Sequence, residues 1–290
     1  MNTIWSDYVQ NTGTLYLSRS LRFSNEYKKA YMNAFDIADR KRILEIGCGP
    51  GALTQALARW YPDAEILGTD RDAAFIRFAA QQAPGIRFME ADATALPFED
   101  QSFDVVISNT VQEHIEPSLF FGEQSRVLKP GGVCLVLSAR RGVNITADCV
   151  EEKSSLEKEI WARVEAVCQD VNNRYGVGKY AMSESKLPRT MEQYGFHQVS
   201  TRYLTVNLTP DNPENSKESA YAMINAHRQT SLDAVESLPL IAPGAVSEEE
   251  VQEMKEMIDQ RYDRRIELYD KGIKQWDTSM SLTMILRGVR

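Results

Sequence analysis

From residue 42 onward the chain alternates short apolar runs with longer segments in which apolar residues recur every three or four positions. Short apolar runs are typical of buried strands, and the longer spacing is typical of amphipathic helices. Their alternation predicts a parallel sheet whose strands are joined by crossover helices. We expect strands at 42–46, 65–69, 86–90, 103–108 and 133–138, and helices at 51–60, 72–82 and 117–128.

The pattern changes after residue 138, where two long helical stretches follow late strands. Ligands bind at the carboxyl ends of parallel strands, so we expect these stretches to form a cap over a ligand site. Ser247 and Glu250 have the spacing of a capping box and predict the start of one helix. The elements expected are helices at 150–174 and 184–194, a strand at 196–207, helices within 210–277 and a strand at 280–286.

The first forty residues are rich in aromatic side chains. The second half of this stretch is predicted to be helical, whereas the first half has no clear period. We expect most of these aromatic residues to pack into the core, with a lid over the ligand site as the alternative.

The composition of the chain limits the classes of partner and the compartment that we expect. The chain has 290 residues, of which 43% are hydrophobic and 26% charged, as in an ordinary globular protein. Its net charge of -8 disfavours nucleic acid as a partner, because such binding depends on Lys and Arg neutralising phosphates. The four cysteines form no Cys-x-x-Cys pair and no metal-binding cluster. With no signal peptide apparent and no apolar run long enough to insert into a membrane, we expect a cytoplasmic protein without a metal.

A glycine-rich turn joins the first strand to the helix after it. Gly47, Gly49 and Gly51 alternate directly after the apolar strand, a geometry that lets the backbone approach a nucleotide-like ligand closely. The third glycine is one position too early for the dinucleotide pattern, although Ala52 occupies the slot that the pattern assigns to Gly or Ala. The glycines alone therefore leave the ligand open, and a merely tight strand-to-helix turn is the alternative.

Four separated motifs indicate which ligand the glycine turn binds. They are Leu44-Glu-Ile-Gly-Cys-Gly-Pro-Gly51, Asp70 at the end of the second strand, Glu90-Ala-Asp-Ala93, and Phe103-Asp-Val-Val-Ile-Ser-Asn109 with Leu128-Lys-Pro-Gly-Gly132 after it. In this order the chain closely resembles the class I S-adenosylmethionine-dependent methyltransferases, in particular the bacterial small-molecule type. The resemblance covers about 42–138 well and the rest only in outline.

The resemblance implies an α/β fold over a single domain, 1–290. This is a Rossmann-like, seven-stranded, mostly parallel sheet with the last strand antiparallel, helices on both faces and helical cap insertions. The expected segments are an N-terminal helical and aromatic lid at 1–40, a cofactor-binding core at 41–139, cap insertions at 140–186 and 210–277, and strands six and seven within 187–209 and 278–290.

The resemblance also implies the cofactor and its contacts. S-adenosyl-L-methionine is expected as methyl donor and S-adenosyl-L-homocysteine as product. Glu45 orders the glycine loop, and the backbone of Gly47, Cys48, Gly49 and Gly51 passes the methionine and ribose. Asp70 accepts hydrogen bonds from both ribose hydroxyls, with capping of the next helix as the alternative role, for which Asp72 is the better candidate. Arg71 lies along the adenine, Asp92 and the N–H of Ala93 contact its edge, and Asn109 lines the methyl side.

The predicted reaction is an in-line displacement on the sulfonium methyl by a small-molecule acceptor. His114 is a candidate general base or acceptor-orienting group, with Glu113 as a second candidate and an ordinary loop histidine as the alternative. The motif Asn/Asp-Pro-Pro-Tyr is missing after the fourth strand, which favours a metabolite over nucleic acid or protein. A lipid-like or quinone-type acceptor stays open.

Two other classes of function remain open. One is a non-catalytic S-adenosylmethionine-binding protein, and the other is a nicotinamide-dependent oxidoreductase, which leaves Asp92 and Lys129-Pro-Gly-Gly132 unexplained. The sequence leaves open whether the protein is a monomer or a homodimer.

Overall fold

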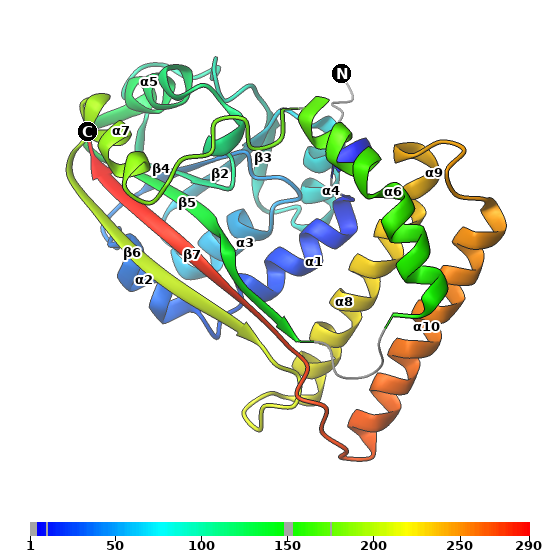
Figure 1. The fold of residues 1–290 in the computed structure, drawn as a ribbon. Helices are drawn as coiled ribbons and strands as arrows, with labels where there is room; N and C mark the ends of the chain where they lie inside the picture. The colour runs from blue at the N-terminus through cyan, green and yellow to red at the C-terminus, as the bar shows by residue number, and fades with distance from the viewer. Residues whose placement is uncertain (1–4, 10, 148–152, 175) are drawn as a thin grey trace.

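The computed structural model describes residues 5–9, 11–147, 153–174 and 176–290 and contains a seven-stranded sheet in the order β3-β2-β1-β4-β5-β7-β6. Six strands run parallel, and β7 pairs antiparallel with β5 on one side and β6 on the other (Figure 1). The Rossmann-like fold with an antiparallel last strand is therefore confirmed. The strands are β1 (Arg42–Ile46), β2 (Glu65–Asp70), β3 (Arg87–Glu90), β4 (Phe103–Asn109), β5 (Leu128–Ala147), β6 (His197–Leu208) and β7 (Thr278–Val289).

Several helices start at a residue whose side chain caps them. Ser247 forms the predicted capping box with Glu250, and Asn11 accepts hydrogen bonds from two backbone N–H groups of the first helix. In the described part of the chain, no helix has the length and apolar character to cross a membrane. The elements are η1 (Trp5–Val9), α1 (Thr12–Arg22), α2 (Lys28–Phe35), α3 (Ala52–Trp60), α4 (Ala73–Gln82), η2 (Gln112–His114), α5 (Pro117–Val127), α6 (Ser155–Arg174), α7 (Lys186–Gln193), α8 (Lys217–Glu236), α9 (Leu238–Ile241) and α10 (Glu248–Asp270).

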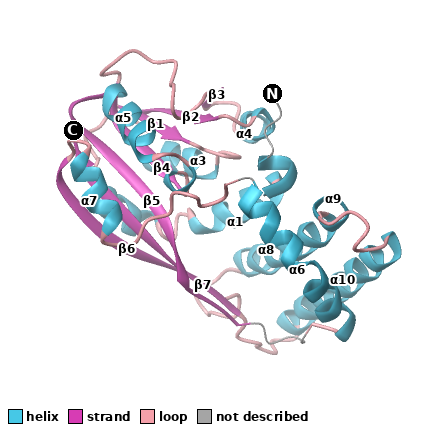
Figure 2. Ribbon diagram, turned by 45° about the horizontal axis from the view of Figure 1, so that its top comes forward, coloured by secondary structure: helices cyan, strands magenta, loops and turns pink. Residues whose placement is uncertain are grey.

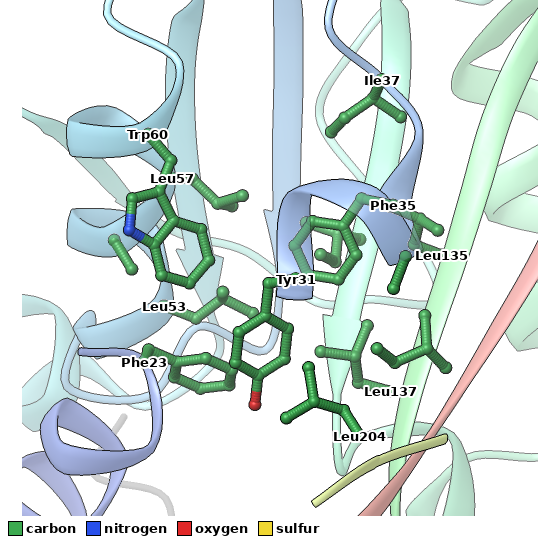
Figure 3. Packing of buried hydrophobic residues seen from close by; sticks show 14 of the residues in the cluster. Phe23, Tyr31, Phe35, Ile37, Leu53, Leu57, Trp60, Leu135, Leu137 and Leu204 are labelled. Atoms are coloured by element: carbon green, nitrogen blue, oxygen red, sulfur yellow. The ribbon is translucent and has the colours of Figure 1, made fainter. Parts of the chain in front are cut away.

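Both faces of the central strands β1 and β4 are buried, and successive residues of these strands point to opposite sides. In β4, Val105 belongs to the core cluster on one face and Val106 to the cluster on the other. The first cluster also contains aromatic residues from the N-terminal stretch, as Figure 3 shows for Phe23, Tyr31 and Phe35. Core packing is thus the role of these three aromatic side chains.

The fifth strand is much longer than its apolar run. The sequence predicts it at 133–138, whereas β5 continues to Ala147 because β7 pairs with it as far as Thr278. The register between the two strands shifts between Ala139 and Asn144. This extension carries the ladder of β5, β7 and β6 beyond the rest of the sheet, toward the long helices (Figures 1 and 2).

Helices α6, α8, α9 and α10 form a helical lobe with a hydrophobic core of its own, which includes Ile160, Ile224 and Met254. A buried ion pair joins Arg261 to Glu157 at 2.5 Å and ties α10 to α6. Helix α1 packs against α8 of the lobe as well as against α3 and α4 of the sheet domain. It therefore separates the carboxyl end of the sheet from the lobe (Figure 1).

A second buried ion-pair group anchors the lobe where it meets the sheet. The guanidinium of Arg265 on α10 is fully buried and binds Asp211 at 2.9 Å and Asp277 at 2.6 Å. These carboxylates lie in the connections that enter and leave the lobe. Breaking such a buried group is costly, since the remaining charges lose their compensation.

Candidate functional site

The glycine turn lies at the carboxyl end of β1. Gly47 has φ of +66°, and a Cβ there would stand 2.4 Å from Cγ2 of Val111. Gly51 has φ of +86°, and a Cβ there would stand 2.9 Å from the ring of Phe88. Both positions therefore require glycine for conformation and for space. Gly51 packs the turn onto β3, whereas Gly47 keeps it close to the loop after β4.

Glu45 and Cys48 are buried beside this turn. Thr54 Oγ1 donates to Glu45 Oε2 at 2.5 Å, which connects β1 to α3. Burial raises the pKa of the Glu45 carboxyl to about 8. Burial also raises the pKa of the Cys48 thiol, so this cysteine stays protonated and is a packing residue of the turn.

Asp70 is held in place by two backbone donors. The N–H of Gly49 donates to Asp70 Oδ2 at 2.8 Å, and the N–H of Asp72 donates to Asp70 Oδ1 at 2.9 Å. Helix α4 is capped instead by Asp72, which accepts from the N–H of Ala74 at 2.9 Å. Each carboxylate oxygen of Asp70 thus keeps further acceptor capacity for a ligand. Burial raises the pKa of Asp70.

Asp92 and Arg71 lie on the neighbouring edge of the site. Asp92 is exposed and accepts from the hydroxyl and the N–H of Thr94 at 2.7 and 2.8 Å. The hydrogen bond from the Thr94 side chain lowers the pKa of Asp92, so it is an anion at neutral pH. The Arg71 guanidinium lies 6.0 Å from the centre of the Trp5 ring.

A cavity of about 530 Å³ brings most of the predicted residues together. This volume is in the range of pockets that hold drug-sized ligands. Gly51 is the one predicted residue that does not line it, because it packs against α4 and β3. The predicted residues on its wall are Glu45, Gly47, Cys48, Gly49, Asp70, Arg71, Asp92, Ala93, Asn109, Glu113 and His114.

The loop after β4 is tied to the segment that follows α6. His114 Nδ1 accepts the N–H of Gly178 at 3.0 Å, and the carbonyl of Glu113 accepts the N–H of Tyr180 at 2.9 Å. The His114 ring also meets the Trp5 ring edge to face, with centroids 4.6 Å apart. Tyr180 itself lines the cavity. The first predicted cap insertion therefore contributes one wall of the site.

Helix α1 supplies residues that the sequence analysis did not single out. Leu15 and Arg19 of α1 and Phe23, the residue directly after it, line the cavity at steps of four, the spacing of one helix face. Arg19 Nη2 donates to Thr110 Oγ1 at 3.3 Å, just beyond β4. Thr110 has φ of +55°, which is rare for a β-branched residue and is typical of strained functional sites. The spacing of four and the Asn11 cap are the signals that identify this helix.

The second predicted cap insertion lies elsewhere. Helices α8, α9 and α10 are on the far side of α1, and none of their residues lines this cavity in the part of the chain that the structure describes. The cover over the site is formed by η1, α1 and the 177–180 segment instead.

Comparisons with known proteins agree with this geometry. Residues 44–136 match the family model of a methyltransferase domain. The chain is 39% identical over 104 residues to a fatty-acid O-methyltransferase of Mycolicibacterium smegmatis, covering 34% of this chain and 38% of the relative. It is 43% identical over 96 residues to a probable phthiotriol/phenolphthiotriol dimycocerosates methyltransferase 2 of Mycobacterium ulcerans, covering 32% and 37%. The matches thus span less than two fifths of these relatives.

Among solved structures, phosphoethanolamine N-methyltransferase 2 of Haemonchus contortus in complex with S-adenosyl-L-methionine aligns with a TM-score of 0.53 at 18% identity. The alignment covers 99% of this chain and 59% of the other, and at this identity it shows a shared fold. The resemblance to class I S-adenosylmethionine-dependent methyltransferases is therefore confirmed over 44–136.

Proposed function

We propose that this protein transfers the methyl group of S-adenosyl-L-methionine to a small-molecule acceptor. One observation carries the proposal: a carboxylate oriented by two backbone N–H groups, Asp70, shares a cavity with the glycine turn of a matched methyltransferase segment. Asp70 would hold the ribose hydroxyls, while Asp92, Ala93 and Arg71 would hold the adenine. The methionine portion would lie along the turn, toward the end of β4.

Methyl transfer from a sulfonium needs few catalytic side chains, because the sulfonium is already a good leaving group. When bound, the cofactor supplies a sulfonium methyl whose C–S bond breaks with its electron pair going to sulfur. The acceptor atom forms the new bond to carbon, and any proton it carries leaves to solvent or a base. The protein must align the two reactants at about 3–3.5 Å and exclude water. Trp5 and Tyr180 lie on the wall of the site and would provide that cover.

An orienting role suits His114 better than proton abstraction. Its Nδ1 lone pair accepts the N–H of Gly178. In the neutral ring the proton is then on Nε2, which makes this nitrogen a donor. A ring in this state positions an acceptor and the loop after β4 but removes no proton from the acceptor. Glu113 stays the second candidate for a base, since it also lines the cavity.

The acceptor class follows from the proteins that this chain resembles and from its charge. The two relatives are named for methylating fatty acids and phthiotriol lipids, so a lipid-like small molecule is a proposed acceptor here. The net charge of -8 supports a partner other than nucleic acid. We place the reaction in the cytoplasm, because Cys48 and Cys134 are buried free thiols.

Calorimetric titration with S-adenosyl-L-methionine and, separately, S-adenosyl-L-homocysteine tests the proposal. We expect micromolar binding that Asp70→Ala abolishes and that Asp63→Ala, at an exposed site away from the cavity, leaves unchanged. Failure of both ligands to bind the unaltered protein refutes the proposal, and binding of NAD instead favours the oxidoreductase alternative. Binding without mass gain of one methyl in any compound of an acceptor screen favours the non-catalytic alternative.

A further inference from the structure

A second cavity, of about 820 Å³, lies on the other side of α1. Its walls are α1 on one side and α8 and α9 of the helical lobe on the other. Val9, Leu15 and Arg19 line both cavities, so the two spaces share a partition. Figure 2 shows α1 between the sheet and the lobe. A molecule in the second cavity would therefore lie next to the methyl-donor side of the first.

Three residues that line this second cavity carry a buried polar atom without a hydrogen-bond partner. The atoms are Ser6 Oγ, Thr14 Oγ1 and Asp233 Oδ2, as judged within the described residues. The other oxygen of Asp233 accepts from Gln229 Nε2 at 2.7 Å, and the residue is only 9% exposed. An unsatisfied buried polar atom costs about 1–3 kcal/mol. These atoms are closed off from the cavity, so they mark polar positions beside it and not contacts to a ligand.

Two cations lie side by side on the α1 wall. Arg19 and Arg22 are one helical turn apart, and both line the second cavity. Neither forms an ion pair with a carboxylate of the described residues. Burial and the neighbouring charge of Arg22 lower the pKa of Arg19 to about 10, and burial lowers the pKa of Arg22. Both arginines are partly buried, and the nearby charge of Glu113 raises the pKa of Arg19. An anion bound between the two guanidinium groups would offset their mutual repulsion.

The rest of the wall sets the size and polarity of the ligand. Away from the arginines, apolar side chains alternate with uncharged polar ones, and the apolar side chains would contact a hydrocarbon body. Asp233 and Glu236 on the opposite wall disfavour an anion with several charges. The apolar residues that line this cavity and not the first are Leu21, Leu208, Ala226, Ala234, Leu240 and Ile241.

We propose that the second cavity is the acceptor site and that the acceptor is a carboxylic acid with an apolar body, whose carboxylate binds Arg19 and Arg22. This inference rests on the proposed methyl transfer, which supplies the reason for two adjoining sites. Guanidinium groups bind carboxylates through paired, charge-assisted hydrogen bonds. Because Leu15 and Arg19 line both cavities, a carboxylate bound to Arg19 would lie at the boundary with the first cavity, on whose wall His114 lies.

The test uses decanoate as the probe, with decan-1-ol and decyltrimethylammonium as neutral and cationic probes of matched length. Calorimetry is run on the full chain with and without saturating S-adenosyl-L-homocysteine. We expect decanoate to bind at least tenfold more tightly than the other two. Arg22→Gln should weaken decanoate binding at least tenfold, equivalent to about 1.4 kcal/mol, and Arg22→Lys should restore part of it. Arg87→Gln, an exposed arginine on β3, is the matched control.

A second variant locates the probe. Thr230→Trp places a large side chain into the second cavity from α8 and should abolish decanoate binding while S-adenosyl-L-homocysteine binding persists. Equal binding of the three probes, or decanoate binding that Arg22→Gln and Thr230→Trp leave intact, overturns the inference. If the unaltered protein does not bind S-adenosyl-L-homocysteine, that separate result refutes the proposed cofactor but leaves the proposed carboxylate site standing.

Discussion

Replacing Gly47 with alanine should destabilise the protein in two separable ways. The new Cβ would stand 2.4 Å from Cγ2 and 3.2 Å from Cγ1 of Val111, whereas carbon atoms prefer a separation of about 3.5–4.0 Å. Overpacking of this kind typically costs about 1–3 kcal/mol. The φ of +66° adds about 1–2 kcal/mol for a residue with a side chain. The expected loss is therefore roughly 2–5 kcal/mol of unfolding free energy.

Two companion variants divide this loss into its parts. Gly131→Ala introduces the backbone cost alone, since Gly131 has φ of +72° and no atom within 4 Å of the new Cβ. Val111→Ala removes both colliding methyl groups and by itself costs about 1–2 kcal/mol. In the double variant of Gly47 and Val111 the collision disappears and the backbone cost remains. We expect it to be about 1–3 kcal/mol more stable than the sum of the single effects.

Urea unfolding followed by circular dichroism measures all four proteins, and thermal midpoints provide a second measure. If Gly47→Ala destabilises no more than Gly131→Ala, the collision with Val111 is absent. If the effects of Gly47→Ala and Val111→Ala add within about 0.5 kcal/mol, the two residues are not coupled. Either result would refute the account of the glycine turn given by the structure.

Three further predictions concern single side chains. His114→Asn keeps a hydrogen-bond acceptor for the N–H of Gly178 and should lower turnover less than tenfold without changing the pH profile. Loss of a general base typically costs about 10²–10⁴-fold, so a loss of that size would show that His114 acts as the base. Glu45→Gln should gain stability relative to the unaltered protein as pH rises from about 4.5 to about 8. Over this range the raised pKa of the Glu45 carboxyl in the folded protein makes its ionisation oppose folding. A difference in urea unfolding that does not depend on pH would contradict this prediction. Arg265→Ala should cost about 3–5 kcal/mol in the same assay, because the buried carboxylate of Asp211 and the partly buried carboxylate of Asp277 lose their cation. The exposed ion pair lost in Arg163→Ala should cost below about 1 kcal/mol, and equal losses in the two variants would contradict the anchoring role.

Local patterns were sufficient for the core of the sheet. Strand β1 and its glycine turn follow from an apolar run and three glycines within ten residues. Asp72 was the better candidate for the cap of α4, and the structure assigns it that role. In each case the residues that determine the structure are close together in the sequence. The division of the chain into core and cap segments stays a prediction.

Long-range partners were not accessible in this way. The extension of β5 to Ala147 depends on pairing with β7, more than 130 residues later in the chain. The role of Arg19 depends on Thr110 and on the helical lobe, which meet α1 only in the folded chain. The mixed polar and apolar face of α1 is explained by two cavities, one on each side of it.

The position of β7 has a consequence for synthesis. Its neighbours in the sheet, β5 and β6, are translated well before it, and they meet only through β7. Until Thr278–Val289 leaves the ribosome, β5 and β6 present unpaired edges, which are templates for aggregation. The sheet domain therefore closes after translation of β7 and not progressively along the chain. A ribosome-bound chain that stops before residue 278 should depend on chaperones that shield those edges.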